Sequence, residues 1–80
     1  MKIERIISWF DLNTEELLGE RNIDNVPLEV LKQIFKPEEE DPLMYNPYTI
    51  NIEEAAQLEK LIDIEFDLKR FFYQVDCFQV

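Results

Sequence analysis

The sequence predicts one small α+β domain, residues 1–80, in which two helices pack on an antiparallel sheet of about three strands. Apolar and polar residues alternate near both ends of the chain, which is typical of half-buried strands. Between these ends apolar residues recur every three or four positions, which is typical of helices. With 46% hydrophobic residues and one glycine, the chain is also too apolar to be disordered. The expected order of elements is β-β-α-α-β.

A β-hairpin is expected at the N-terminal end. Residues 2–10 form an extended segment with apolar side chains on both sides, so that Trp9 and Phe10 face in opposite directions. Residues 11–15 contain Asp and Asn, whose side chains hydrogen-bond to the backbone of turns. Residues 16–23 then alternate again, and the two extended segments make the hairpin.

The first helix is expected after residues 24–27, where a capping residue and an early proline are typical of a helix start. Pro37 ends this helix because proline cannot continue it. A loop that begins at Glu38 and contains Pro42 and Pro47 should lie, ordered, against the domain. The apolar residues that form the buried side of the helix are Leu28, Leu31, Ile34 and Phe35.

A second helix and a last strand complete the expected fold. Asn51 and Glu54 have the spacing of a capping box, and helical periodicity continues through about Ile62. Residues 63–68 alternate acid with apolar residue, as on one exposed face of a strand. Residues 69–80 alternate as well, so that the chain ends in a strand.

Charge and composition exclude several functions. The chain has 18 acidic and 8 basic residues, a net charge of −10, which excludes binding to nucleic acid or to an anionic membrane. It has no histidine and one cysteine, Cys77, so the usual zinc sites, His-activated nucleophiles and intramolecular disulfides cannot form. No apolar run resembles a signal peptide. We therefore expect a cytoplasmic protein that is no enzyme, binds no metal and needs no cofactor.

One acidic pattern resembles a calcium loop without fulfilling its rules. Asp63, Glu65 and Asp67 have the required alternation. However, Leu68 stands at the sixth position, where glycine is needed, and Gln74 at the twelfth, where a bidentate glutamate is needed. The alternation is better explained by a strand.

Aromatic residues are concentrated in the two expected strands at the ends of the chain. A nucleic-acid stacking platform would be repelled by the charge of −10, and a small domain needs its large side chains for the core. We therefore expect these five residues in the core: Trp9, Phe10, Phe71, Phe72 and Tyr73.

Four consecutive acids and two nearby tyrosines are the best candidates for contact with a partner. The acids follow the first helix, whose C-terminus already carries partial negative charge. Negative side chains are unfavourable at this end of a helix, so their placement favours an external partner. A solvated loop explains them at least as well. Tyrosine suits an anchor for a cationic surface, although these two could equally cover one end of the sheet. The candidate partner-binding residues are Glu38, Glu39, Glu40, Asp41, Tyr45 and Tyr48.

Three segments carry a family resemblance: residues 7–11 (Ile-Ser-Trp-Phe-Asp), 17–20 (Leu-Leu-Gly-Glu) and 41–48, which begins Asp-Pro-Leu-Met-Tyr. Over its full length the chain resembles a small family of uncharacterised bacterial proteins. Such acidic proteins are similar to the immunity proteins of contact-dependent and polymorphic toxin systems. The resemblance implies that the protein binds and neutralises a cognate toxin domain, typically a basic nuclease. Immunity proteins share no common motif, so no functional residue is transferred.

The sequence therefore leaves two hypotheses for the function, which belong to different classes. The first is an immunity protein whose acidic surface meets the cationic cleft of a toxin. The alternative is an acidic structural or regulatory subunit that binds some other protein. An enzyme that uses paired carboxylates comes third, because among 18 acids no spacing singles out a catalytic pair.

Overall fold

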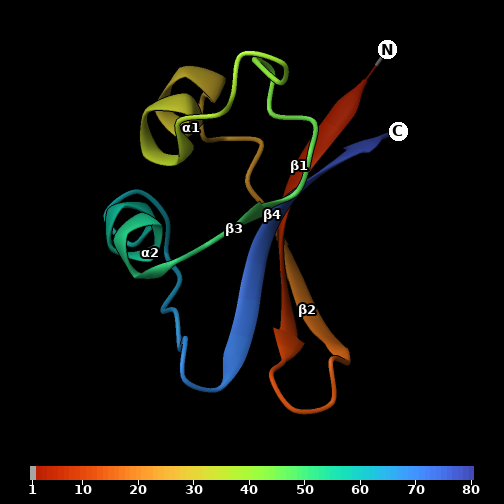
Figure 1. Cartoon of the computed structure of the whole chain (residues 1–80), viewed down its shortest axis with the longest axis vertical. Helices are drawn as coiled ribbons and strands as arrows, with labels where there is room; N and C mark the ends of the chain where they lie inside the picture. The colour runs from red at the N-terminus through yellow and green to blue at the C-terminus, as the bar shows by residue number, and fades with distance from the viewer. Residues whose placement is uncertain (1) are drawn as a thin grey trace.

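The computed structural model describes residues 2–80 and confirms an α+β fold with one antiparallel sheet. The sheet has four strands in the order β2-β1-β4-β3, so the N-terminal and C-terminal strands lie side by side at its centre (Figure 1). The order along the chain is β-β-α-β-α-β. The elements are β1 Ile3–Asp11, β2 Leu17–Asn22, α1 Leu28–Phe35, β3 Tyr48–Thr49, α2 Ile52–Leu58 and β4 Phe71–Gln79.

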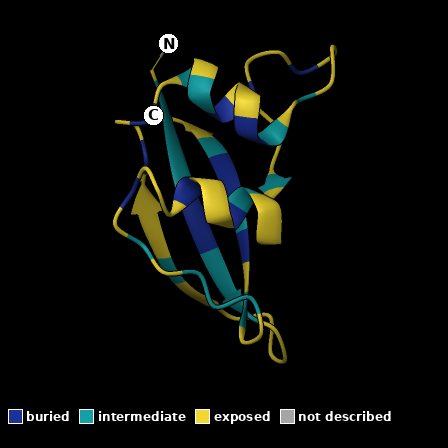
Figure 2. Cartoon of the chain, turned by 90° about the vertical axis from the view of Figure 1, so that its left-hand side faces the viewer, coloured by how far each residue is buried: buried dark blue, intermediate teal, exposed yellow. Residues whose placement is uncertain are grey.

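Both helices lie on the same face of the sheet. Figure 1 shows them together on one side of the strands, and Figure 2, seen from that side, shows both in front of the sheet with exposed residues facing outward. Ile7 of β1 pairs with Val75 of β4, and both are buried under the helices. The core consists of Ile7, Ile23, Val26, Leu31, Ile34, Met44, Ile50, Ala55, Leu58, Ile62, Tyr73 and Val75.

The hairpin is confirmed, and its close packing explains the position of the only glycine. Trp9 of β1 pairs with Gly19 of β2 and packs against the core, with its ring centroid 6.0 Å from that of Tyr73. A Cβ atom at residue 19 would lie 3.0 Å from Trp9 Nε1 and closer still to two ring carbons. The indole therefore occupies the space that the missing side chain leaves, and a β-bulge follows between Trp9 and Phe10.

The first helix lies where the sequence predicts it, but the residue before it does not cap it in the expected way. Its N-cap is Pro27, which makes no side-chain capping hydrogen bond. The carboxylate of Asp24 accepts hydrogen bonds from Arg5 N at 2.8 Å and from Asn22 Nδ2 at 3.1 Å instead. Asp24 thus ties the end of β2 to β1 rather than capping the helix.

The second half of the chain differs from the expectation in three places. The capping box forms, with Glu54 Oε1 accepting from Asn51 N at 2.9 Å, but α2 ends at Leu58 rather than Ile62. A short strand, β3, pairs with β4 just before this helix. Residues 63–68 are not a strand, because they have no neighbouring strand to pair with and the chain needs this length to return to the sheet.

The loop before β4 is held by side-chain hydrogen bonds. Glu59 Oε2 accepts from Phe66 N at 2.9 Å, and Tyr73 Oη accepts from Asp67 N at 3.1 Å. The acidic alternation of this segment is therefore not an exposed strand face. Within residues 2–80, neither helix has the length and apolar character needed to cross a membrane.

Candidate functional site

The acidic run after α1 divides into an exposed part and a buried part. Glu38, Glu39 and Glu40 are exposed, whereas Asp41 is 7% exposed. Their side chains thus have different tasks, although the sequence places them in one unbroken run.

Asp41 organises the loop that follows it. Its Oδ1 accepts a hydrogen bond from Tyr45 N at 2.8 Å, and its Oδ2 accepts from Asn46 N at 3.1 Å and from Tyr48 Oη at 2.6 Å. Two backbone N–H groups and one phenol of the same loop therefore converge on one carboxylate. Asp41 is occupied within the fold and does not present its charge to a partner.

The two tyrosines also separate. Tyr48 is half-buried on the helix side, with its ring centroid 6.0 Å from that of Phe35, so it covers one end of the sheet. Tyr45 is 44% exposed and lines a hollow of about 260 Å³ together with Ile3, Cys77 and Gln79. Of the two tyrosines, Tyr45 is the more exposed to solvent.

The contact between Asp41 and Tyr48 shifts the pKa of both groups. The phenol donates to the carboxylate and holds the pKa of Asp41 below its ordinary value of 3.8. Burial, together with the same hydrogen bond, raises the pKa of Tyr48 to about 12. Each group is thus stabilised in the protonation state that it has at neutral pH.

Tyr48→Phe should reveal this coupling as a pH-dependent loss of stability. Because the folded state holds the phenolic proton above the ordinary pKa of 10.0, the contribution is fully present below pH 10 and is lost as pH rises toward about 12. At pH 7 the substitution should lower the free energy of unfolding by about 2 kcal/mol, as for a hydrogen bond to a charged group. Urea unfolding from pH 7 to 11 measures this difference, which should narrow above pH 10. Tyr45→Phe is the matched control and should cost less than about 0.5 kcal/mol.

The face of the sheet opposite the helices has no covering element among residues 2–80 (Figure 1). Strand residues alternate between the two faces, and directly paired residues share a face. Ile7 and Val75 lie under the helices, so their strand neighbours point the other way. We call this surface the open face. It consists of Glu4, Ile6, Ser8 and Phe10 of β1, Leu17, Glu20 and Asn22 of β2, Thr49 of β3, and Phe72, Gln74, Asp76 and Phe78 of β4.

Two residues expected in the core, Phe10 and Phe72, lie on the open face instead. They pair across β1 and β4 with ring centroids 6.2 Å apart, and Phe72 is 37% exposed. Phe78 on the same face is 45% exposed. The alternation of the strands contained this signal, but the sequence did not show that one face stays uncovered.

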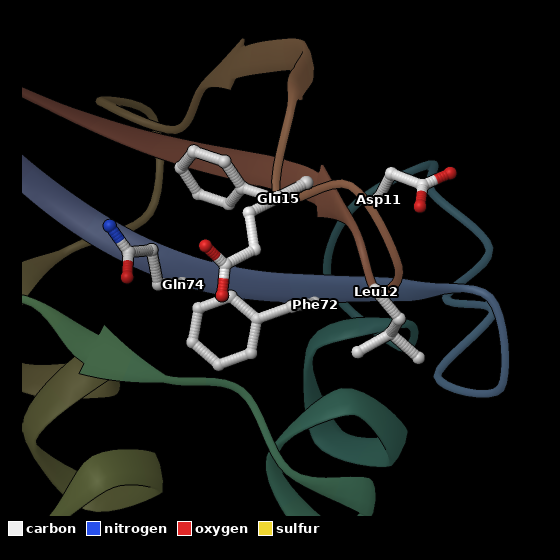
Figure 3. Close-up of a pocket in the computed structure, with 6 residues that line it drawn as sticks. Asp11, Leu12, Glu15, Phe72 and Gln74 are labelled. Atoms are coloured by element: carbon white, nitrogen blue, oxygen red, sulfur yellow. The ribbon is translucent and has the colours of Figure 1, made fainter.

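A hollow of about 370 Å³ lies on the open face beside the hairpin loop. Figure 3 shows the side chain of Glu15 extending over Phe72 toward Gln74, whereas the carboxylate of Asp11 points away from this space. Phe10, Phe72 and Leu12 supply the apolar part of the lining. The hollow thus combines apolar walls with a carboxylate at its mouth.

The hairpin loop fixes the backbone from which the Glu15 side chain extends. Asp11 Oδ1 accepts from Asn13 N at 2.7 Å and from Thr14 N at 2.9 Å, which closes the turn and lowers the pKa of Asp11. Glu15 has a φ of 63°, and its N–H donates to Asp11 O at 2.8 Å. This left-handed conformation is unusual for glutamate, so the turn dictates where the Glu15 side chain points.

A hydrogen-bonded polar cluster lies at the centre of the open face. Ser8 Oγ donates to Asp76 Oδ2 at 2.9 Å, and Gln74 Nε2 donates to Asp76 Oδ1 at 2.8 Å. Ser8 is 2% exposed and Asp76 is 9% exposed, because larger neighbours flank them. A carboxylate is thus held in a fixed position between apolar side chains.

Among the described strand positions of the open face, the charged residues are all acidic, namely Glu4, Glu20 and Asp76. The two arginines of these strands belong to the helix side. Arg5 Nη2 donates to Leu43 O at 2.5 Å, and Arg21 Nη1 donates to Asp63 O at 2.6 Å. The open face therefore combines exposed aromatic surface with unbalanced negative charge.

Residues 4–76 match a protein family described as a domain of unknown function (DUF7683). The chain belongs to this family. Comparison with curated proteins finds no match. In this DUF7683 domain both candidate surfaces, the acidic loop and the open face, fall within the matched residues, with Phe78 just beyond them.

The hollow on the open face of the DUF7683 domain is lined by apolar, acidic and neutral polar side chains. The hollow has no basic residue, nucleophile pair or phosphate-binding loop in its lining. Of its two carboxylates, that of Glu15 extends over Phe72, and that of Asp11 points away from the hollow (Figure 3).

Proposed function

We propose that this DUF7683 domain is a non-enzymatic, cytoplasmic immunity protein that binds and neutralises a basic bacterial toxin domain such as a nuclease. The observation that carries the proposal is the open face, a sheet surface with exposed aromatic rings and with acidic charges at the strand positions Glu4, Glu20 and Asp76. A nuclease presents the complementary surface, because its cleft must be cationic to bind phosphate. Occupation of that cleft by an acidic surface blocks the substrate.

The two kinds of residue on the open face have separate tasks in this proposal. Phe72 and Phe78 provide rigid apolar anchors that are held by short-range packing. Glu4, Glu20 and the exposed acids Glu38, Glu39 and Glu40 attract the partner over longer distances. Asp41 and Tyr48 take no direct part, since they are engaged with each other. Tyr45 lies beside Ile3, Cys77 and Gln79, whose strand positions belong to the helix side, so it is a separate candidate contact.

A second copy of the chain is a poor occupant of the open face. Two copies, each with a charge of −10, repel one another, and a symmetric contact would set the acids of one face against those of the other. A basic partner, by contrast, gains electrostatic attraction from the same charges.

Co-expression tests the proposal directly. Cells that express a toxin domain encoded next to this gene should survive with the wild-type protein and die without it. Phe72→Ala should raise the dissociation rate by about 30-fold, equivalent to about 2 kcal/mol. Ile52→Ala is the matched control, because Ile52 is 76% exposed but lies on the helix side, and it should protect as well as wild type.

Added salt should distinguish the long-range attraction between the two proteins from the short-range contacts that hold the complex. Added salt should slow association steeply while changing dissociation less, because screening acts on long-range attraction. Combined neutralisation of Glu38, Glu39 and Glu40 should slow association without unfolding the domain. If no adjacent toxin exists, or survival does not depend on this protein, the immunity proposal is wrong. A pull-down partner of another kind would then favour the acidic binding subunit.

A further inference from the structure

We infer that the carboxylate of Asp76 is the docking point for an arginine side chain of the partner. The inference rests on the proposed binding function of the open face and adds the chemistry of the group that is bound there. It begins from the unusual position of Asp76, a charged residue that is 9% exposed at the centre of an uncovered sheet face.

Among residues 2–80, the side chains that the strands place around Asp76 on the open face include no cation. Its two hydrogen bonds come from Ser8 and Gln74, which are neutral. Ile6 pairs with it on β1, Glu4 lies diagonally across that strand, and Phe78 follows on its own strand. Buried carboxylates are generally paired with a positive charge, so this one is matched by a cation that another molecule brings.

The carboxylate is prepared to accept further hydrogen bonds. Ionised aspartate offers about four acceptor positions, and one donor on each oxygen leaves about two of them unused. The two donors fix the orientation of the carboxylate before any partner arrives. Such preorganisation reduces the entropy that is lost on binding.

The surroundings of Asp76 select guanidinium among cations. Rings of Phe10 and Phe72 lie beyond Ser8 and Gln74 on one side, and Ile6 with Phe78 lies on the other. Guanidinium is planar and weakly hydrated, stacks on aromatic faces and donates two parallel hydrogen bonds to a carboxylate. An ammonium group is more strongly hydrated and gains less from apolar walls. Calcium requires six to eight oxygen ligands, more than one carboxylate and its neutral neighbours supply.

Nuclear magnetic resonance with a short peptide tests the inference without any toxin. The labelled full chain is titrated with acetyl-Gly-Arg-Gly-amide, and the side-chain signals of Asp76 and Gln74 are followed. They should shift in a saturable manner, at millimolar peptide concentration. The peptide in which citrulline replaces arginine is nearly identical in shape but neutral and should bind at least tenfold more weakly. The affinity of the peptide in which lysine replaces arginine should lie between the affinities of the other two peptides.

Variants locate the site. Asp76→Asn, which keeps the shape of the side chain, should weaken the binding of the arginine peptide at least tenfold. Glu53→Gln on α2 removes one charge from the helix side and should leave the affinity unchanged. Equal binding of the arginine and citrulline peptides by the wild-type protein would overturn the inference, even if Asp76→Asn failed to fold. So would an unchanged affinity in folded Asp76→Asn.

The outcomes also separate this inference from the proposed function. Peptide binding at Asp76 without any toxin protection would retain the arginine site and reject the immunity role. Toxin protection that survives Asp76→Asn at wild-type affinity would retain the immunity role and reject the arginine site.

Discussion

Replacing Trp9 by alanine is expected to lower the free energy of unfolding by about 3 kcal/mol. Trp9 fills the space above Gly19, contacts the ring system around Tyr73 and packs against the buried core, so its removal leaves a cavity at the centre of the fold. Because Trp9 is the only tryptophan, unfolding in urea must be followed by circular dichroism. Phe78→Ala, an exposed aromatic residue of β4, is the matched control and should cost less than about 1 kcal/mol.

The same contact predicts a strong coupling between Trp9 and Gly19. Gly19→Ala in the wild-type background should cost about 1 to 3 kcal/mol, because the new methyl group collides with the indole. In the Trp9→Ala background it should be neutral or stabilising, since the space is free and glycine is unfavourable within a strand. A double-mutant cycle measures the difference. Equal costs of Gly19→Ala in both backgrounds would contradict the described packing.

Asp41→Ala should lower the melting temperature by at least about 8 °C, whereas Glu39→Ala should change it by less than about 2 °C. The alanine leaves Tyr45 N, Asn46 N and Tyr48 Oη without their acceptor, and the loop that they form closes one side of the core. Thermal unfolding at pH 7 compares the two variants, which remove the same charge from positions two residues apart. Equal melting temperatures would show that Asp41 does not organise the loop.

Acid should reproduce part of the Asp41→Ala effect. The pKa of Asp41 lies below 3.8 in the folded state, so its contribution is present above pH 3.8 and is lost as pH falls through the lowered pKa. In Asp41→Ala this particular loss should be absent. The difference between the melting temperatures of the wild-type protein and of Asp41→Ala should therefore become smaller as the pH falls from 6 to 3.

Much of the fold follows from local patterns in the sequence. The period-two alternation of β1 and β4, the helical spacing of Leu28 to Phe35 and the capping box at Asn51 are all determined by neighbouring residues, and each forms as predicted. The strand that the sequence did not predict, β3, has only two residues, Tyr48 and Thr49. It forms by pairing with β4, which is far away along the chain. No local pattern predicts such a pairing.

The candidate site was predicted less well, for a physical reason. A run of four acids looks uniform in the sequence, but local hydrogen bonding takes Asp41 into the fold and leaves its three neighbours in solvent. The aromatic residues were assigned to the core because they are large. Alternation shows that Phe10 and Trp9 point to opposite faces, but which faces are covered depends on where both helices dock.

A sheet that is covered on one face only can change its specificity without changing its architecture. Along β1 and β4, one set of alternate residues holds the helices, and the other set meets the surroundings. Substitutions at Phe72, Phe78 or Glu4 leave the helix-side core intact, so these positions can change without loss of the packing that holds the helices. Along the same strands, alternate positions are thus under two different physical constraints, the packing of the helices on one face and contact with solvent on the other.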